Sequence, residues 1–243
     1  MIPIGDDNSR HRGKAVVTWT LIGLNVFVFV FLQKFALDDY ATLALAAIPE
    51  EILSGRRLFT LISCQFTHAG FSHLISNMLF LAIFGDNIEC RIGRLRYTLL
   101  YLISGTIGIL LQILLAAMAG GAALQMPLVG ASAAISGILA AYLVLFPGNK
   151  VVVLLFYFIP TVLSAWLVIG FWFFLQVVGG LSGLTILQNG GTAYFAHIGG
   201  FLSAYLWTKK YKQKELELLY ARRRKRTISG NADGFQWWIV DDE

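Results

Sequence analysis

Six long apolar stretches alternate with polar segments along the chain. They contain no Asp, Glu, Lys or Arg and cover residues 15–32, 66–84, 97–118, 128–146, 151–178 and 192–207. An α-helix rises about 1.5 Å per residue, so roughly 20 apolar residues cross a hydrocarbon core about 30 Å thick. Most of the stretches are long enough to span, and the pattern predicts an all-α membrane protein with six transmembrane helices.

Positive charges are distributed unevenly between the two sides of the predicted membrane. Sixteen Lys and Arg residues fall on the side that carries both termini, and three fall on the other side. Because cytoplasmic loops are enriched in Lys and Arg, both termini are predicted to be cytoplasmic. The pI near 9.3 is then explained by membrane topology, and nucleic-acid binding is not predicted. Only 14% of the residues are charged, against about 25% in soluble domains.

This topology divides the chain into three parts. Residues 1–14 form a cytoplasmic N-terminal tail, residues 15–208 the six-span domain, and residues 209–243 a basic cytoplasmic C-terminal tail. The first apolar stretch lacks a small-residue cleavage site after it, so it is expected to remain as a helix rather than to be removed. The glycine-rich residues 179–191 predict a mobile outer loop. Cys64 and Cys90 fall on opposite sides, so no disulfide is predicted.

Four polar side chains fall at a similar depth in three of the predicted spans. Spans two, four and six run from the outer to the inner side, so their first turns lie near the outer surface. Span two carries His73 and Asn77 four residues apart, on one helical face. Ser132 lies about five residues into span four, and His197 about six residues into span six. Polar groups inside a membrane are costly and usually face a cavity or a partner.

Each of these residues also has a purely structural interpretation. A serine in a membrane helix most often bonds the carbonyl one turn earlier, and a single His or Asn often joins two helices. Their shared depth favours a common site. Small residues support this meeting, because they let helices approach closely. They form one stripe on span four and another on span six, namely Ala133, Gly137 and Ala141, and Ala196, Gly200 and Ala204.

The four residue types together suit acyl transfer. A serine hydroxyl becomes a nucleophile when a base removes its proton, and a neutral His is the usual base near pH 7. The tetrahedral intermediate then needs hydrogen-bond donors, which His73, Asn77 and the N–H groups at the start of span four can supply. No Asp or Glu occurs within any span. The prediction is therefore a Ser132–His197 dyad rather than a triad.

At this point the chain resembles the rhomboid family of intramembrane serine proteases. Four segments match in the family's order, namely FTHAGFSHLISNMLFLAIFGDNIE, GRLRYTLLYLISG, GASAAISGILAAYLVLFP and AHIGGFLSAYL. The resemblance covers roughly residues 15–208 and implies the six-helix rhomboid fold. It also implies Ser132 as nucleophile, His197 as base, and His73 and Asn77 as oxyanion residues.

The resemblance further implies what the protein does and where. The family cleaves transmembrane segments of other membrane proteins near their outer ends, without metal or cofactor. The outer loop after span one is expected to pack against the membrane, and span five to gate substrate access. The compact six-span form is more like bacterial members, which predicts the bacterial cytoplasmic membrane with the active site opening to the outer side.

Two departures from the family pattern keep an alternative open. The serine motif is usually Gly-x-Ser-Gly, whereas Ala133 follows Ser132 here. Its methyl group is a candidate source of crowding in the oxyanion pocket or against span six, and with it of lowered or narrowed activity. A Trp-Arg pair common in the outer loop is also missing, and Arg56 and Arg57 occupy that region. The alternative is a rhomboid-like protein that binds membrane clients without cutting them. A transporter is a weaker third, because no span carries a charge for ion coupling.

Overall fold

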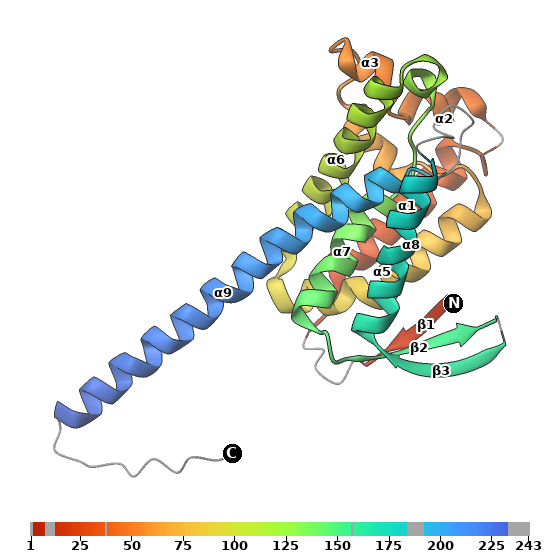
Figure 1. Ribbon diagram of the computed structural model, residues 1–243. Coiled ribbons are helices and arrows are strands. Elements are labelled where there is room, and N and C mark those ends of the chain that lie inside the picture. The colour runs from red at the N-terminus through yellow and green to blue at the C-terminus, as the bar shows by residue number, and fades with distance from the viewer. Residues whose placement is uncertain (1, 8–12, 37, 157, 184–191, 233–243) are drawn as a thin grey trace.

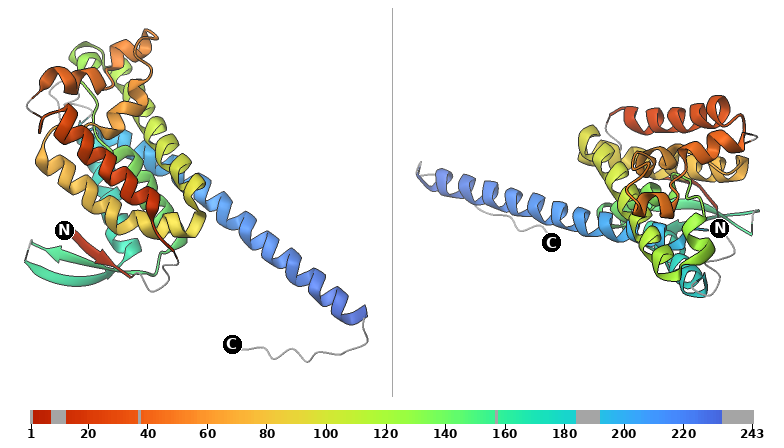
Figure 2. Two further views of the ribbon diagram at one scale, coloured as in Figure 1. Left: turned by 180° about the vertical axis from the view of Figure 1, so that it is seen from behind. Right: turned by 90° about the horizontal axis from the view of Figure 1, so that it is seen from above.

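The computed structural model describes residues 2–7, 13–36, 38–156, 158–183 and 192–232, and this part of the chain is mostly helical. The bundle is formed by α1 (Val16–Phe27) with the π-helix η1 (Val28–Leu32), α5 (Phe71–Ile92), α6 (Arg94–Ala119), α7 (Ser132–Leu145), α8 (Ala165–Gly183) and α9 (Tyr194–Ala232). Figure 1 shows α9 leaving the bundle as a long helix, and both views in Figure 2 show the same projection.

The apolar helices are consistent with a membrane protein. Among the described residues, α6 and the Ala165–Ser182 part of α8 are long and apolar enough to cross a membrane. Residues Thr60–Phe66 and α5 form a third candidate if this pair, bent by 92°, counts as one span. The α1–η1 segment and α7 are apolar but shorter. The number of crossings and the side of the termini remain predictions.

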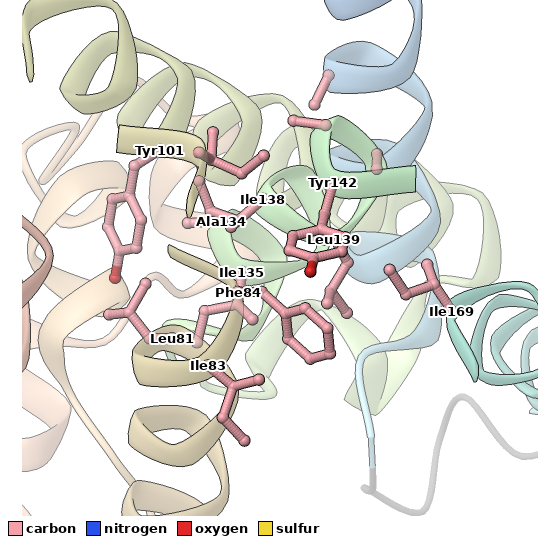
Figure 3. Packing of buried hydrophobic residues seen from close by; sticks show 14 of the residues in the cluster. Leu81, Ile83, Phe84, Tyr101, Ala134, Ile135, Ile138, Leu139, Tyr142 and Ile169 are labelled. Atoms are coloured by element: carbon pink, nitrogen blue, oxygen red, sulfur yellow. The ribbon is translucent and has the colours of Figure 1, made fainter. Parts of the chain in front are cut away.

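Helix α7 lies at the centre of the bundle. Every residue from position 133 to position 142 is buried. Figure 3 shows Ile138, Leu139 and Tyr142 of α7 among side chains of α5, α6 and α8. Phe84 of α5 meets Tyr142 edge-on, with ring centroids 5.0 Å apart. A helix that is apolar and surrounded on all sides has little freedom to shift, so α7 is a rigid support for the residue at its start.

Short helices cover the end of the bundle where α7 begins. They are α2 (Asp39–Leu45), α3 (Pro49–Leu53), α4 (Thr60–Ser63), and the 3₁₀ turns η2 (Cys64–Phe66) and η3 (Gly121–Gln125). Ala47 pairs with Leu128 in an isolated bridge, and the Gly130 N–H donates to the Cys64 carbonyl at 2.9 Å. Figure 1 shows α2 and α3 at one end of the molecule and the strands at the other. The predicted outer segment therefore contacts the chain leading into α7.

A three-stranded antiparallel sheet, which the sequence analysis did not predict, lies at the opposite end. Its order is β1 (Ile2–Asp6), β2 (Lys150–Leu155) and β3 (Ile159–Ser164). The predicted span over residues 151–178 is therefore wrong in its first part, because the helix begins only at Ala165. Hydropathy alone does not separate a buried strand from a helix. Here three consecutive valines favour a strand, and β1 supplies an edge to pair with.

The two predicted tails contain regular structure where they are described. Strand β1 lies within residues 1–14, and α9 continues through the predicted tail as far as Ala232. The predicted mobile loop over residues 179–191 begins as the last turn of α8, and its residues 184–191 lie outside the described part of the chain. Residues 233–243 of the C-terminal tail also lie outside it.

Helix α1 begins against a carboxylate from another helix. Glu89 of α5, almost fully buried, accepts hydrogen bonds from the backbone N–H groups of Val17 and Thr18, at 2.9 and 2.7 Å. The first N–H groups of a helix have no partner within the helix and carry partial positive charge. Glu89 therefore satisfies the start of α1 and joins it to α5.

Asp6 joins the sheet to the C-terminal halves of α7 and α5. Its carboxylate accepts hydrogen bonds from the Tyr142 hydroxyl and, at 2.8 Å, from the Asn87 amide. Burial, with the neighbouring carboxylates of Asp86 and Asp7, raises the pKa of Asp6 to about 6. The ionised form is thus disfavoured in the folded state.

We expect Asp6→Asn to remove a pH dependence of stability. A carboxyl whose pKa is raised on folding binds its proton more tightly in the folded state, so its contribution is present below about pH 4 and is lost as pH rises through about 6. The amide keeps an acceptor for Tyr142 and carries no charge. The variant and the wild type should melt alike at pH 4, and the variant should melt higher at pH 7.

Thermal melts in detergent between pH 4 and pH 8 measure this difference. Asp38→Asn is the matched control, because the Ala41 N–H holds the pKa of that half-buried helix-capping carboxyl below its usual range. The Asp38→Asn variant should show the same decline in melting temperature above pH 4 as the wild type. A gap between Asp6→Asn and wild type that stays constant with pH would contradict the role given to Asp6.

Candidate active site

Ser132 and His197, predicted from the sequence to meet, lie in hydrogen-bond contact. Ser132 is the first residue of α7, and His197 lies in the first turn of α9. The Ser132 Oγ is 2.7 Å from the His197 Nε2. The imidazole is buried, with 8% of its surface exposed. A hydroxyl and an imidazole at this distance have the geometry of a nucleophile and its base.

The close approach of α7 and α9 produces this contact. A Cβ atom on Gly200 would lie closer than 3.0 Å to the backbone carbonyl of Ala133. A Cβ on Gly137 would lie 3.2 Å from the Cβ of Ala204. The predicted small-residue stripes on these two helices therefore face each other, as expected. Since Ala133 follows Ser132 and Gly200 lies about one turn after His197, the same contact sets the distance between hydroxyl and ring.

Two glycines of α6 complete this packing, and the sequence analysis missed them. A Cβ on Gly108 would collide with the Ala196 carbonyl, and one on Gly105 would collide with the Gln65 side chain. Helix α6 thus lies directly on the backbone of α9. The signal available in the sequence was the pair of glycines three residues apart in an otherwise large-residue span.

The methyl group of Ala133 is accommodated at this three-helix contact. It lies 3.1 Å from the position that a Cβ would take on Gly108. Ala133 is buried, at 3% exposure, whereas the neighbouring Ser132 and Ile135 line the cavity described below. The predicted crowding is therefore directed toward α6 and α9, where the missing Cβ of Gly108 leaves room, rather than into the cavity.

Gly130 lets the ring of His73 approach the serine. Its φ of +123° lies in the region that favours glycine. A Cβ there would lie 2.7 Å from the His73 Cε1, 2.8 Å from its Nε2 and 3.6 Å from the Ser132 Oγ. The imidazole of His73 and the hydroxyl thus lie on either side of a residue that has no side chain.

His73 and Asn77 present donors to the same space. The Ala69 N–H donates to the His73 Nδ1 at 3.4 Å. In a neutral imidazole the other nitrogen, Nε2, then carries the proton and is a donor. The Asn77 amide donates one hydrogen to the His73 carbonyl at 2.8 Å, which leaves its second hydrogen for another acceptor. Both residues can therefore stabilise negative charge beside Ser132.

A cavity of about 1030 Å³ joins the four predicted residues. Ser132, His197, His73 and Asn77 all line it. Its walls come from the starts of α5, α7 and α9, from the chain before α7, and from the second half of α8. Apolar side chains supply much of the rest, namely Phe80, Met126, Leu128, Ile135, Leu139, Leu175 and Val178. The lining suits an apolar polypeptide segment.

Gln176 of α8 is a site residue that the sequence analysis missed. Its Oε1 is 2.8 Å from the His197 Nδ1, so the ring is held between a glutamine and the serine. Trp172, one turn earlier on α8, covers the ring, with centroids 6.0 Å apart. The signal available in the sequence was Gln176 itself, a polar residue in an apolar span that contains no carboxylate. The described residues contain no group of three or more His, Cys, Asp or Glu that could hold a metal ion.

The chain is similar to known proteins over most of its length. The profile of the Rhomboid domain matches residues 55–214. The mitochondrial Rhomboid protein 1 of Saccharomyces cerevisiae is 29% identical over 219 residues, which cover 83% of this chain and 57% of that protein. RHOMBOID-like protein 4 of Arabidopsis thaliana is 32% identical over 158 residues, covering 65% of this chain and 35% of that protein. This chain therefore spans little more than half of the first relative and about a third of the second.

Proposed function

The chain belongs to the rhomboid family, and from this premise we propose that it is a serine endopeptidase that cleaves transmembrane segments of other proteins within the bilayer. The observation that carries the proposal is the 2.7 Å contact between the Ser132 Oγ and the His197 Nε2 at the wall of a largely apolar cavity. A largely apolar cavity of this kind fits a hydrophobic segment better than a soluble peptide.

In the proposed reaction, His197 acts as base and then as acid. The Ser132 hydroxyl passes its proton to the His197 Nε2 as Oγ bonds to the carbonyl carbon of the substrate. The carbonyl electron pair moves onto oxygen, and the C–N bond then breaks as the imidazolium gives its proton to the leaving nitrogen. A water molecule, deprotonated by the same ring, hydrolyses the acyl-enzyme and restores the serine.

The developing oxyanion is assigned to the donors beside the hydroxyl. We assign the protonated Nε2 of His73, the second amide hydrogen of Asn77 and the N–H groups at the start of α7 to this task. The N-terminus of a helix carries partial positive charge, which favours an anion there. The hydrogen bond between Ala69 and His73 supports the assignment, because it leaves the proton on the nitrogen that faces Gly130.

A client-binding protein without proteolysis is the second candidate, and Ala133 is the observation that favours it. The environment of this residue supports the protease instead, because its methyl group lies against Gly108, outside the cavity lining. The two candidates differ in one measurable property. A protease has an activated serine, whereas a binder has no need of one.

Labelling by a fluorophosphonate probe tests the proposal. Such probes phosphonylate a serine hydroxyl that a neighbouring base activates. The purified full chain in detergent is expected to be labelled, and Ser132→Ala is expected to lose the label. Ser203→Ala is the matched control, because that hydroxyl lies on α9 and donates to the Gly200 carbonyl. Absence of labelling in the wild type, or labelling that survives Ser132→Ala, would reject the proposed nucleophile.

For the membrane arrangement, we propose six spans with both termini in the cytoplasm and the cavity opening on the outer side. The distribution of Lys and Arg supports this orientation. The names of two relatives, from yeast and Arabidopsis thaliana, place those proteins in mitochondria. For this chain we propose the bacterial cytoplasmic membrane, on the strength of its compact six-span form.

A further inference from the structure

Gln176 is a buried polar side chain whose amide has a fixed direction. Its Nε2 donates to the Trp172 carbonyl at 3.3 Å, one turn earlier on the same helix. Its Oε1 therefore faces the Nδ1 of His197, 2.8 Å away. Since an amide oxygen only accepts, the Nδ1 must carry the proton of the neutral ring.

This order of donors prepares the other ring nitrogen as a base. A neutral imidazole has one N–H, so a protonated Nδ1 leaves the Nε2 with a free electron pair. That nitrogen is the one 2.7 Å from the Ser132 Oγ. The chain of contacts thus runs from a backbone carbonyl of α8, through Gln176 and His197, to the serine hydroxyl.

A glutamine suits this position better than a carboxylate. Gln176 and His197 are each 8% exposed. Burying an ionised carboxylate in such surroundings carries a large desolvation penalty unless an imidazolium faces it, whereas a hydrogen-bonded amide needs no such partner charge. The amide orients the ring without adding a charge.

Helix α8 is less enclosed than its partners in this contact. In the apolar window of α8 only 28% of the residues are buried, whereas every residue of α7 from position 133 to position 142 is buried. Its main packing is against α9, where Phe173 stacks on Phe201 with centroids 4.1 Å apart. Near its end, a Cβ on Gly179 would lie 2.5 Å from the Tyr194 ring, so the two helices approach closely beside His197. Helix α8 therefore has less buried surface to lose on moving than the central helix α7 has.

We propose that Gln176 is a positioning residue which makes His197 competent as a base only while α8 packs against α9. The proposal rests on the proposed function. When α8 moves aside to admit a substrate segment, the Gln176 amide and Trp172 leave the His197 ring. The proton is then no longer held on the Nδ1. Closure of α8 on the bound segment restores the contact. Helix α8 therefore has two positions, one that admits the substrate and one that orients His197 as a base.

The first test compares Gln176→Leu with Gln176→Glu. The leucine variant keeps the volume but loses the acceptor, so kcat for a transmembrane substrate should fall by on the order of 10- to 100-fold, while KM changes less than about twofold. The glutamate variant restores an acceptor and adds a negative charge that favours the imidazolium. It should recover activity, with the acidic limb of its pH–rate profile moved to higher pH.

Gln112→Leu is the matched control for these variants. Gln112 is another buried glutamine, on α6, and its Oε1 has no hydrogen-bond partner among the described residues. This variant should keep the wild-type kcat and pH profile. An unchanged kcat in Gln176→Leu would overturn the proposal, as would a glutamate variant that neither recovers activity nor shifts the profile.

The tautomer of His197 can be measured without an activity assay. The ¹⁵N shifts of histidine-labelled protein, assigned for His197 by comparison with His197→Ala, should show a protonated Nδ1 in wild type and a tautomer mixture in Gln176→Leu. The other titratable side chains lining the cavity are His73 on α5 and Tyr194 on α9 itself, and the assigned resonance separates His197 from both. If the protein proves not to be a protease, this result still decides the role of Gln176. Identical tautomers in the two proteins would overturn it.

The coupling to α8 is tested by a double-mutant cycle. Phe173→Ala weakens the packing of α8 on α9 and should lower kcat. If this loss acts through Gln176, then Phe173→Ala added to Gln176→Leu should cost little more than Gln176→Leu alone. If the fold-losses in kcat of the two substitutions multiply instead, α8 packing acts independently of the base, and the coupling is overturned.

Discussion

Ser132→Ala and His197→Ala are each expected to lower the cleavage of a transmembrane substrate by roughly 10³-fold or more, to the uncatalysed background. The reason is that the 2.7 Å contact makes the two side chains one unit, in which the ring takes the proton of the hydroxyl. Losses from residues that act as a unit do not add, so the double variant should be no slower than either single variant.

The measurement is cleavage of a model substrate by the purified full chain in liposomes, followed on gels. Ser203→Ala is the control, because it removes a hydroxyl from α9 two turns beyond His197. Ser132→Ala and Ser203→Ala should melt within a few degrees of wild type, since a single hydroxyl contributes little to packing. Cleavage that persists in both Ser132→Ala and His197→Ala would remove these residues from the reaction.

Gly200→Ala is expected to have the second-largest effect, on stability and activity together. The added Cβ would meet the backbone carbonyl of Ala133, closer than any real Cβ contact. A backbone atom in a buried helix cannot rotate away, so α7 and α9 must separate. Overpacking of this kind costs about 1–3 kcal/mol. The same separation would lengthen the contact between Ser132 and His197, so we expect activity to fall by at least about tenfold.

Thermal melts in detergent and cleavage assays measure the two effects. Gly23→Ala is the matched control, because a Cβ on that α1 glycine meets nothing within 4 Å. It should keep its activity and gain slightly in helix stability. If Gly200→Ala matched Gly23→Ala in both assays, the interface between α7 and α9 would not be the element that sets the catalytic distance.

The helical periodicity of the sequence was enough to identify much of the candidate site. Spacing placed His73 and Asn77 on one face, and depth in the spans placed Ser132 and His197 at one level. The small-residue stripes indicated which helices meet, and the structure confirms that Gly200 faces Ala133. These features are local, because a helix converts the order of residues along the chain directly into faces and heights.

Other features arose only from contacts between distant segments. Whether residues 151–164 form a helix or a hairpin depended on β1, some 150 residues earlier, offering an edge. Whether the methyl group of Ala133 crowds the cavity depended on the absence of a Cβ at Gly108 of α6.

The partner of His197 was likewise decided by packing. The apolar pattern of α8 does not show which way Gln176 points. The rotation of α8 and its close approach to α9 at Gly179 turn the Gln176 side chain toward the His197 ring. The sequence by itself determined most of the helices, their polar faces and the candidate catalytic residues. The tertiary structure decided which of those faces touch, because interhelical distances depend on side-chain volumes from several chain segments at once, and no single segment encodes that sum.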